Sequence, residues 1–455
     1  MNGAILGAGS VETHERLNLA SILQCMDCER QYPIDAVMYV CDSCGGLLDV
    51  HHDLDALKPT VTRALFESRL GALDAPYNSG VWRYKELIYP DISDDMIVSR
   101  PEGNTNLYRQ ASLAAWCGVD TLYLKHEGEN PTGSFKDRGM TGGLTQARRL
   151  GMQRVACAST GNTSASLAAY AAFAGLEGIV FFQNKQVAVG KLAQAVAYGA
   201  TGVRIDADFD KNLELVRTVS EALGIYVLNS VNPFRLEGQK SIMFEVLQQL
   251  KWNVPDWIVV PGGNLGNSSA FGKGLWELHH LGLIDRLPRV AIIQAEGASP
   301  LYEAYQRGFD RLVPQKADTI ATAIKIGNPV NYAKAVRTIH WTNGVVESVT
   351  DQEIMDAKAL IDASGIGCEP ASACSLAGTR KLVEAGIIQR GDSVVGILTG
   401  HVLKDPEAII NYHSDQLPHI RPAYPTRLYE SGPSVEELSR ILLREPANPL
   451  KSVRG

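Results

Sequence analysis

The stretch TLYLKHEGENPTGSFKDRGMTGGLTQARRLG, residues 121–151, decides the fold. Its first seven residues alternate as in a β-strand, its centre is rich in Gly, Pro and Ser, and its end has the pattern of a helix. The same order of strand, turn and helix recurs from about residue 100 onward. Further strands are expected at 154–159, 178–182, 202–207, 225–230, 257–263, 290–296 and 393–400. Repeated β-α units predict parallel sheets covered by helices, and therefore an α/β fold.

The bulk composition is that of a globular enzyme. A chain of 455 residues is too long for one small domain, so two or three domains are expected. A formal charge of −7 argues against nucleic acid as a partner. The apolar stretch 164–182 is rich in Ala and Ser, so it indicates a buried helix and strand rather than a membrane span. The beginning of the chain shows no secretory signal. The eight cysteines are not a disulfide framework in a chain this long, so a reducing cytoplasm is expected.

Four of the eight cysteines are clustered near the N-terminus. Cys25 and Cys28 form one CxxC pair, and Cys41 and Cys44 form a second pair after twelve intervening residues. Two such pairs are typical of a zinc ribbon, in which four thiolates surround one structural Zn²⁺. The alternative is four reduced structural cysteines in a small β-hairpin. The acidic balance of this segment argues against a nucleic-acid-binding ribbon.

In open α/β sheets, ligands bind beyond the carboxyl ends of the strands. The first strand end to consider is the loop that carries Lys136, because that residue lies near an expected helix start. There the helix dipole and Arg138 lower the proton affinity of an amine. A neutral amine is what Schiff-base chemistry requires. The alternative is a lysine that pairs with a phosphate or carboxylate, or one that is merely exposed.

Three more strand ends carry candidate binding groups. The polar turn 159–164 precedes a long helix, whose free N–H groups could bind a carboxylate, although an elaborate helix cap is the alternative. The glycine-rich segment 260–274 could hold a phosphate through its backbone, yet it matches neither the P-loop nor the GxGxxG pattern. Thr399 ends an apolar strand, where its hydroxyl could meet a ring nitrogen or simply satisfy a backbone group.

These groups together fit pyridoxal 5'-phosphate. That cofactor has an aldehyde for Lys136, a phosphate for the glycine-rich segment and a pyridine nitrogen for Thr399. Asn162 could contact the phenolic oxygen of the ring. A nicotinamide or ATP cofactor would not need the isolated lysine.

Six segments carry a family resemblance: HEGENPTGSFKDRGM, CASTGNTSA, NPFRLEGQKS, PGGNLGN, CEPASA and LTGHVLKDP. Together they resemble threonine synthase, a member of the fold-type-II (tryptophan synthase β-like) group of pyridoxal-phosphate enzymes. The resemblance runs from about residue 98 to 412 and is closest to the longer plant and cyanobacterial type. It implies two α/β domains with parallel sheets, plus a small zinc-ribbon-like unit at the N-terminus.

The resemblance also assigns site residues. Lys136 is implied as the Schiff-base lysine and catalytic base, Asn162 as the contact of the ring hydroxyl and Thr399 as the partner of the pyridine nitrogen. The cofactor phosphate is assigned to Gly263, Asn264, Leu265, Gly266 and Asn267. The substrate carboxylate is assigned to Ser159, Thr160 and Thr163, and the substrate phosphate to Asn229, Ser230 and Arg235.

The implied activity is the conversion of O-phospho-L-homoserine and water to L-threonine and phosphate. The rival activities are cysteate synthase, which uses O-phospho-L-serine and sulfite, and threonine dehydratase. A non-catalytic binding protein on the same fold is the rival from another class. The expected domains are a zinc-ribbon-like segment 1–52, a large cofactor domain of 53–155 and 236–455, and a small mobile domain 156–235. A homodimer is the expected assembly.

Overall fold

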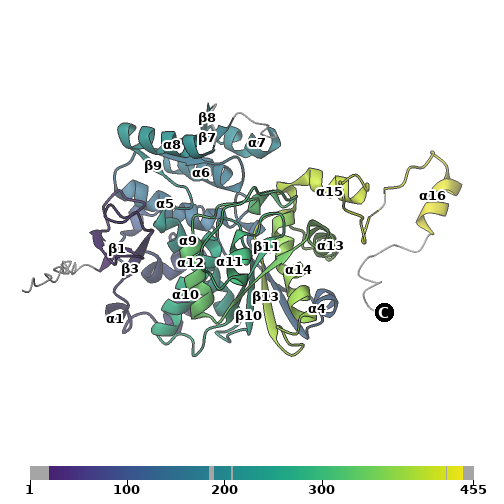
Figure 1. Cartoon of the computed structure of the whole chain (residues 1–455), viewed down its shortest axis with the longest axis horizontal. Coiled ribbons are helices and arrows are strands. Elements are labelled where there is room, and N and C mark those ends of the chain that lie inside the picture. The colour runs from purple at the N-terminus through teal and green to yellow at the C-terminus, as the bar shows by residue number, and fades with distance from the viewer. Residues whose placement is uncertain (1–19, 184–188, 206–208, 427, 444–455) are drawn as a thin grey trace, which may run out of the picture.

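The computed structural model describes residues 20–183, 189–205, 209–426 and 428–443. Within them, two α/β units and a small N-terminal sheet are stacked against one another (Figure 1). The larger sheet has the strand order β12-β11-β10-β13-β5-β4, and the smaller one has the order β8-β7-β6-β9. The smaller sheet is parallel throughout, and the larger sheet is parallel except where its edge strand β4 pairs with β5.

Every strand expected from the repeated β-α pattern is present. These strands are β5 (Thr121–His126), β6 (Arg154–Ala158), β7 (Glu177–Gln183), β8 (Thr201–Ile205), β9 (Ile225–Val227), β10 (Trp257–Pro261), β11 (Arg289–Ala295) and β13 (Ser393–Leu398). The last two residues of the strand expected at 202–207 lie outside the described residues. The sequence pattern missed β4 (Leu107–Arg109) and β12 (Val345–Val349), because both are short edge strands with little alternation.

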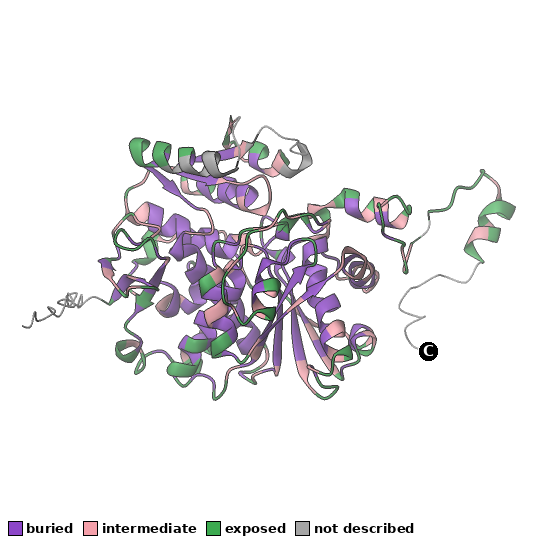
Figure 2. Cartoon of the chain, viewed as in Figure 1, coloured by how far each residue is buried: buried purple, intermediate pink, exposed green. Residues whose placement is uncertain are grey.

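Helices cover both faces of the larger sheet (Figure 1). Successive residues of β10 point to opposite faces: Ile258 packs with α9, α10 and α12, whereas Val259 packs with α4, α13 and α14. Both cores are buried throughout (Figure 2). The helices are α4 (Ala111–Cys117), α9 (Pro233–Gln249), α10 (Gly266–His280), α11 (Pro300–Gln306), α12 (Tyr332–Trp341), α13 (Asp351–Ala363) and α14 (Pro370–Glu384).

The smaller sheet is packed between further helices. One face packs against α5 and α6, and the other against α8. These elements are α5 (Lys136–Arg149), α6 (Asn162–Ala174), α7 (Val189–Ala197) and α8 (Phe209–Leu223). The sheet takes in β6 from its first residue, so the boundary expected at residue 156 falls inside this strand. The domain division itself stays a prediction.

The N-terminal unit is a three-stranded antiparallel sheet with β1 (Ser21–Cys25) between β2 (Gln31–Pro33) and β3 (Leu48–His52). Its apolar side joins the core that contains α9 and α10. Short helices connect it to the main body: α1 (Leu54–Leu57), α2 (Arg63–Ser68) and α3 (Lys85–Ile88). After β13 the chain continues through α15 (Pro406–His413) to α16 (Val435–Leu442), which extends away from the body (Figure 1).

Candidate active site

One cavity lies between the two α/β units and the N-terminal sheet. Its volume of about 2170 Å³ exceeds the roughly 300–1,000 Å³ of a pocket for one small ligand, so a cofactor and a substrate fit together. Its wall includes the loop before α5, the turns after β6 and β10, and the end of β13. Every residue predicted for the cofactor or the substrate lines this cavity, except Arg235.

Lys136 is the first residue of α5, where the sequence predicted a helix start. Its side chain faces the cavity, and the amine lies 4.2 Å from the centre of the Phe135 ring. Within the described part of the chain, no hydrogen bond or ion pair involves this amine. Desolvation, aided by the charge of Arg235, lowers the pKa of Lys136 to about 7, although Glu369 opposes the shift. The amine is therefore neutral for much of its time near physiological pH, as a nucleophile must be.

The loop before Lys136 is pinned to the end of β13. The Phe135 N–H donates to the Thr399 carbonyl at 3.1 Å, and Ser134 forms a β-bridge with Gly400. Asp137 accepts hydrogen bonds from the Thr132 backbone and hydroxyl at 2.7 and 2.6 Å. These contacts hold the amine and the Thr399 hydroxyl against the same cavity, although their parent strands, β5 and β13, are far apart in sequence.

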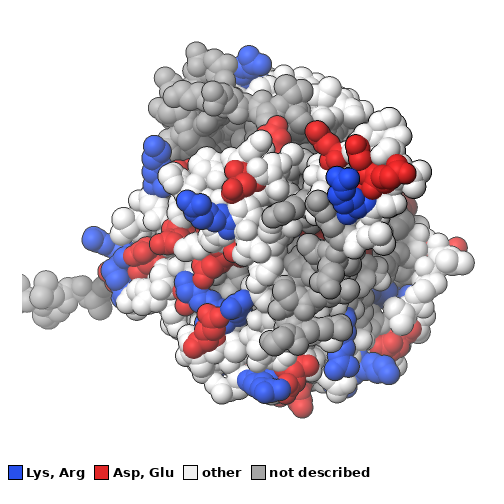
Figure 3. Space-filling view, turned by 90° about the vertical axis from the view of Figure 1, so that its right-hand side faces the viewer, with Lys and Arg blue, Asp and Glu red and all other residues white. Residues whose placement is uncertain are grey.

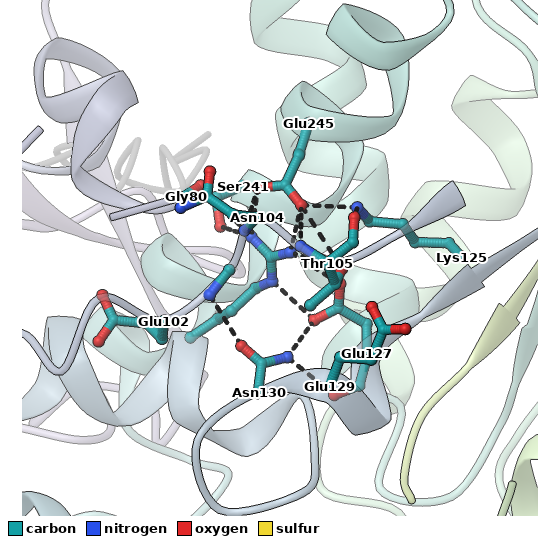
Figure 4. Close-up of polar contacts among 12 residues, drawn as sticks. Gly80, Glu102, Asn104, Thr105, Lys125, Glu127, Glu129, Asn130, Ser241 and Glu245 are labelled. Carbon is teal, nitrogen blue, oxygen red and sulfur yellow. Dashed lines mark hydrogen bonds and ion pairs between the residues drawn. The ribbon is translucent and has the colours of Figure 1, made fainter. Parts of the chain in front are cut away.

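A buried charge network fixes the first turn of α5 (Figure 4). The Arg138 guanidinium donates to Glu127 at 2.6 Å and to Glu245 at 2.9 Å. Glu245 also accepts from the Lys125 amine at 2.6 Å and from Arg83 at 3.3 Å. The network joins the end of β5, the start of α5 and the middle of α9, and so it fixes the direction in which Lys136 leaves its helix.

The turn after β10 has the properties of a phosphate cradle. Leu265 has a left-handed conformation with φ of 63°, after which α10 begins at Gly266. The Asn267 amide is buried, and neither its nitrogen nor its oxygen has a hydrogen-bond partner in the described residues. A Cβ added to Gly263 would lie 3.1 Å from the Ile324 backbone, so the turn closely approaches a neighbouring loop. A buried, unpartnered amide beside a helix N-terminus fits the phosphate of the proposed cofactor.

The polar turn after β6 leads directly into α6. Ser159, Thr160 and Thr163 line the cavity. Among the described residues, α6 has no side-chain cap on its first turn, since Gly161 occupies the cap position. The alternative of an elaborate helix cap is therefore not what the geometry shows. The free N–H groups of that turn are available to a carboxylate.

Two of the three residues predicted for the substrate phosphate line the cavity, and the third does not. Asn229 lines the cavity, but its amide pairs with the backbone of Ala158 at 3.0 and 3.2 Å. Ser230 lines the cavity as well. Arg235 is buried behind the wall and donates to the Leu228 carbonyl at 3.0 Å, while its Nε has no partner in the described part of the chain. Desolvation lowers the pKa of Arg235 to about 10, which still leaves it charged at neutral pH.

Glu369 and Lys404 are charged residues of the wall that had no predicted role. Glu369 is the second residue of the CEPASA segment, and Lys404 lies in the segment LTGHVLKDP. Both segments contributed to the family resemblance, but only Thr399 was assigned a contact. An acid immediately before a Pro that starts a helix was the available signal for Glu369. No local pattern indicates that either side chain turns toward Lys136.

The four N-terminal cysteines converge as the spacing predicted. Their sulfur atoms lie within 4.8 Å of one another, and Cys28 and Cys41 Sγ are 3.6 Å apart. Cys41 of the second pair also borders the cavity, where residues 37–42 form part of the wall. From this segment, the Tyr39 hydroxyl accepts from the Val227 N–H of β9 at 2.6 Å. The cysteine unit therefore contacts both the cavity and the edge of the smaller sheet.

Comparison with known proteins identifies the family of this chain. The family model described as "Pyridoxal-phosphate dependent enzyme" matches residues 98–400. Solved structures support the fold: maize serine racemase aligns with a TM-score of 0.57 at 21% identity over 69% of this chain and 93% of its own. A fungal L-serine ammonia-lyase from Rhizomucor miehei aligns with a TM-score of 0.58 at 21% identity, covering 66% of this chain and 94% of its own. Fold and site thus define a fold-type-II pyridoxal-phosphate enzyme.

Curated relatives narrow the family further. The threonine synthase of Methanocaldococcus jannaschii is 49% identical over 85% of this chain and 94% of its own length. Threonine synthase 2, chloroplastic, of Arabidopsis thaliana is 45% identical over 85% of this chain and 77% of its own. At this identity and coverage, the chain belongs to the threonine synthase family.

Proposed function

We propose that this chain converts O-phospho-L-homoserine and water to L-threonine and phosphate, the last step of threonine biosynthesis. The proposal rests on one observation. Lys136, Thr399 and the turn after β10 that carries Asn267 line one cavity, which has room for a cofactor and a substrate. Each of these groups suits one part of pyridoxal phosphate, and the relatives named above share the family.

The cofactor, when bound, supplies an electron sink for the carbanion that forms at the substrate Cα. Lys136 would hold the cofactor through its amine and would remove and return protons at the substrate Cα and beyond. A pKa of about 7 suits both removal and return of a proton. Thr399 offers a neutral hydroxyl to the ring nitrogen. A neutral partner tempers the electron sink and so restrains side reactions such as transamination.

The remaining wall residues hold the substrate. The turn of Ser159, Thr160 and Thr163 receives the carboxylate on its N–H groups and hydroxyls. Asn229 and Ser230 lie where the substrate phosphate would be placed, with the charge of Arg235 behind them. Holding both ends of the substrate orients its Cα–H bond toward Lys136.

A substrate panel tests this function. Purified protein with pyridoxal phosphate is given O-phospho-L-homoserine or O-phospho-L-serine with sulfite, and phosphate and amino acid products are measured. We expect threonine and phosphate from the first only. Turnover of phosphoserine alone would instead favour cysteate synthase, and no turnover of either would contradict the proposal. Lys136→Ala should abolish turnover and the visible absorbance of the lysine-linked cofactor, whereas the exposed Lys58→Ala should retain both.

We also propose that the four-cysteine cluster holds a structural Zn²⁺. Four thiols within 4.8 Å match the donor set of a closed tetrahedral site. The cluster borders the cavity through residues 37–42 but presents no group to Lys136, so its contribution is to shape the wall.

The proposed setting is a homodimer in the cytoplasm with a small-molecule substrate. All eight cysteines are free thiols, which suits a reducing compartment. Lys and Arg side chains are interspersed with Asp and Glu on the face shown in Figure 3, in keeping with a partner other than nucleic acid. None of the described helices is both long and apolar enough to cross a membrane.

A further inference from the structure

Glu369 is a buried acid in the cavity wall that the proposed mechanism leaves unused. It occupies the position before α14, next to Pro370, and its residue is 4% exposed. The Gly400 backbone packs against its carboxyl group so closely that a Cβ on Gly400 would overlap with it. The carboxyl group therefore has little freedom to move, and its contacts are set by the fold.

Those contacts reach the two side chains proposed to meet the cofactor ring. The Asn162 amide nitrogen donates to both Glu369 oxygens, at 3.0 and 3.2 Å. The Thr399 hydroxyl lies 3.3 Å from Glu369 Oε1. Asn162 starts α6 beside the smaller sheet, and Thr399 follows β13 of the larger sheet. A single carboxyl group thus joins the ring contacts contributed by the two α/β units.

The contacts of Ser372 leave the Thr399 hydroxyl free to donate its own proton. Ser372 Oγ accepts from the N–H groups of Thr399 and Gly400 at 2.8 and 3.0 Å. With both acceptor sites occupied, its own proton is free to go to Thr399 Oγ1, 3.0 Å away. Thr399 then has its own proton to donate, either to Glu369 or into the cavity.

The charge on Glu369 determines whether the Thr399 hydroxyl donates its proton to Glu369 or into the cavity. An ionised carboxylate is a strong acceptor and would draw the Thr399 proton to itself, whereas a protonated carboxyl group competes weakly. Burial raises the pKa of Glu369, although the Asn162 amide, Lys404, the Thr399 hydroxyl and Lys136 oppose the shift. A larger neutral fraction of Glu369 leaves the Thr399 proton available to the cavity.

We propose that Glu369 is a positioning residue, whose carboxyl group orients the Asn162 amide and the Thr399 hydroxyl toward the cofactor ring. This inference rests on the proposed function, because it assumes that Asn162 and Thr399 contact the ring. It gives the CEPASA segment a role in the reaction beyond the start of α14.

Glu369→Gln and Glu369→Asp test the proposal. Gln keeps the length and lacks the charge, so it should retain the cofactor affinity and visible spectrum of the native protein and at least about a third of its kcat. Asp is one methylene shorter and cannot span from Gly400 to both partners. It should shift the visible absorbance, weaken cofactor binding at least about tenfold, and lower kcat more than it raises KM. Glu384→Gln on the exposed part of α14 is the matched control and should change none of these.

Three outcomes overturn the proposal. One is an Asp variant with the native cofactor affinity and spectrum. A second is a Gln variant that binds cofactor normally but has lost turnover, since that would make Glu369 a proton donor or acceptor in the reaction. The third is a Gln variant that, although folded by circular dichroism, loses cofactor affinity as the Asp variant does. Cofactor titration needs no substrate, so the proposal is tested even if O-phospho-L-homoserine is not turned over.

Discussion

At the scale of single residues, the site contains two side chains whose pKa values are shifted by burial toward the uncharged form. Lys136 combines a cavity-facing position with strong desolvation, and its pKa falls to about 7. Glu369 is shifted in the opposite direction, toward its neutral form. Both shifts favour the uncharged species, and both arise from burial between the two sheets rather than from any sequence neighbour.

The Lys136 pKa predicts how the cofactor-free protein takes up pyridoxal phosphate. Only the neutral amine attacks the aldehyde, so the uptake rate should rise about tenfold per pH unit below 7 and level off above about pH 8. Stopped-flow absorbance measures the rate. Nα-acetyl-lysine is the control, and its rate should keep rising toward pH 10. A protein rate that also rises to pH 10 would contradict the shifted pKa.

Arg235 provides a second prediction at this scale. It carries charge behind the wall rather than on it, so Arg235→Ala should raise the KM for phosphorylated substrate at least about tenfold through loss of long-range attraction. Cofactor affinity, measured by absorbance titration, should change less than about threefold. Arg235→Lys should restore part of the substrate affinity. Equal losses for substrate and cofactor would show a packing role instead.

At the scale of elements, the close crossing of α5 and α9 places the catalytic amine. A Cβ on Gly238 of α9 would overlap with the Arg138 carbonyl of α5, so only glycine permits this approach. The same two helices share the ion pair between Arg138 and Glu245. Close backbone contact sets the distance between the helices, and the charge network sets their register.

Gly238→Ala should therefore force α5 away from α9. We expect a loss of about 2 kcal/mol or more in the free energy of unfolding, as for other overpacked cores, together with weaker cofactor binding. Urea unfolding and cofactor titration measure the two effects. Gly391→Ala, at an exposed turn with open space around it, should be close to neutral. A Gly238→Ala protein with native stability would contradict the view that α5 and α9 cannot move apart at this crossing without loss of stability.

The charge network around Glu245 leads to a prediction about how the free energy of unfolding depends on pH. Burial alone would raise the pKa of Glu245, but Arg138, Lys125 and Arg83 outweigh it and hold that pKa well below its usual range. The stability that Glu245 contributes is therefore present above its unfolded pKa of about 4.3 and is lost only as pH falls further, toward the folded pKa. At pH 7, Glu245→Gln should cost about 3–5 kcal/mol because it leaves buried cations unpaired. In urea unfolding, the exposed Glu384→Gln should cost less than about 1 kcal/mol.

At the scale of the whole molecule, three units meet at one cavity. The two α/β units supply the cofactor and substrate residues, and the N-terminal unit closes one side with residues 37–42. Tyr39 links that unit to β9 through its hydroxyl. The wall of the site thus depends on a segment that the cysteine cluster organises.

Metal content tests this dependence. Elemental analysis of purified protein should give about one zinc per chain, and Cys28→Ser with Cys41→Ser should abolish it. Because residues 37–42 border the cavity, the variant should show a KM raised several-fold, with Lys136 still linked to the cofactor. Cys117→Ser, at a buried cysteine far from the cluster, is the control for the loss of a thiol. Full zinc occupancy in the double variant would contradict the assigned ligands.

Local patterns in the sequence predict the α/β class, the strands that precede each binding segment and a helix start near Lys136. These follow from local patterns: alternation, turn residues and a helix start read within one segment. The spacing of the cysteines likewise predicts that the four thiols lie close together, as they do in the structure. The family resemblance supplied the roles that the local patterns left open.

The side chains that face one another could not be predicted from the sequence and became evident from the packing of the elements. This packing placed Arg235 behind the wall, brought Glu369 between Asn162 and Thr399, and assembled the network around Arg138. The physical reason is that burial, pKa and partner choice depend on elements that are distant in sequence and meet only on packing. Glu369 shows this most clearly, since its two ring-side partners lie 207 and 30 residues away along the chain.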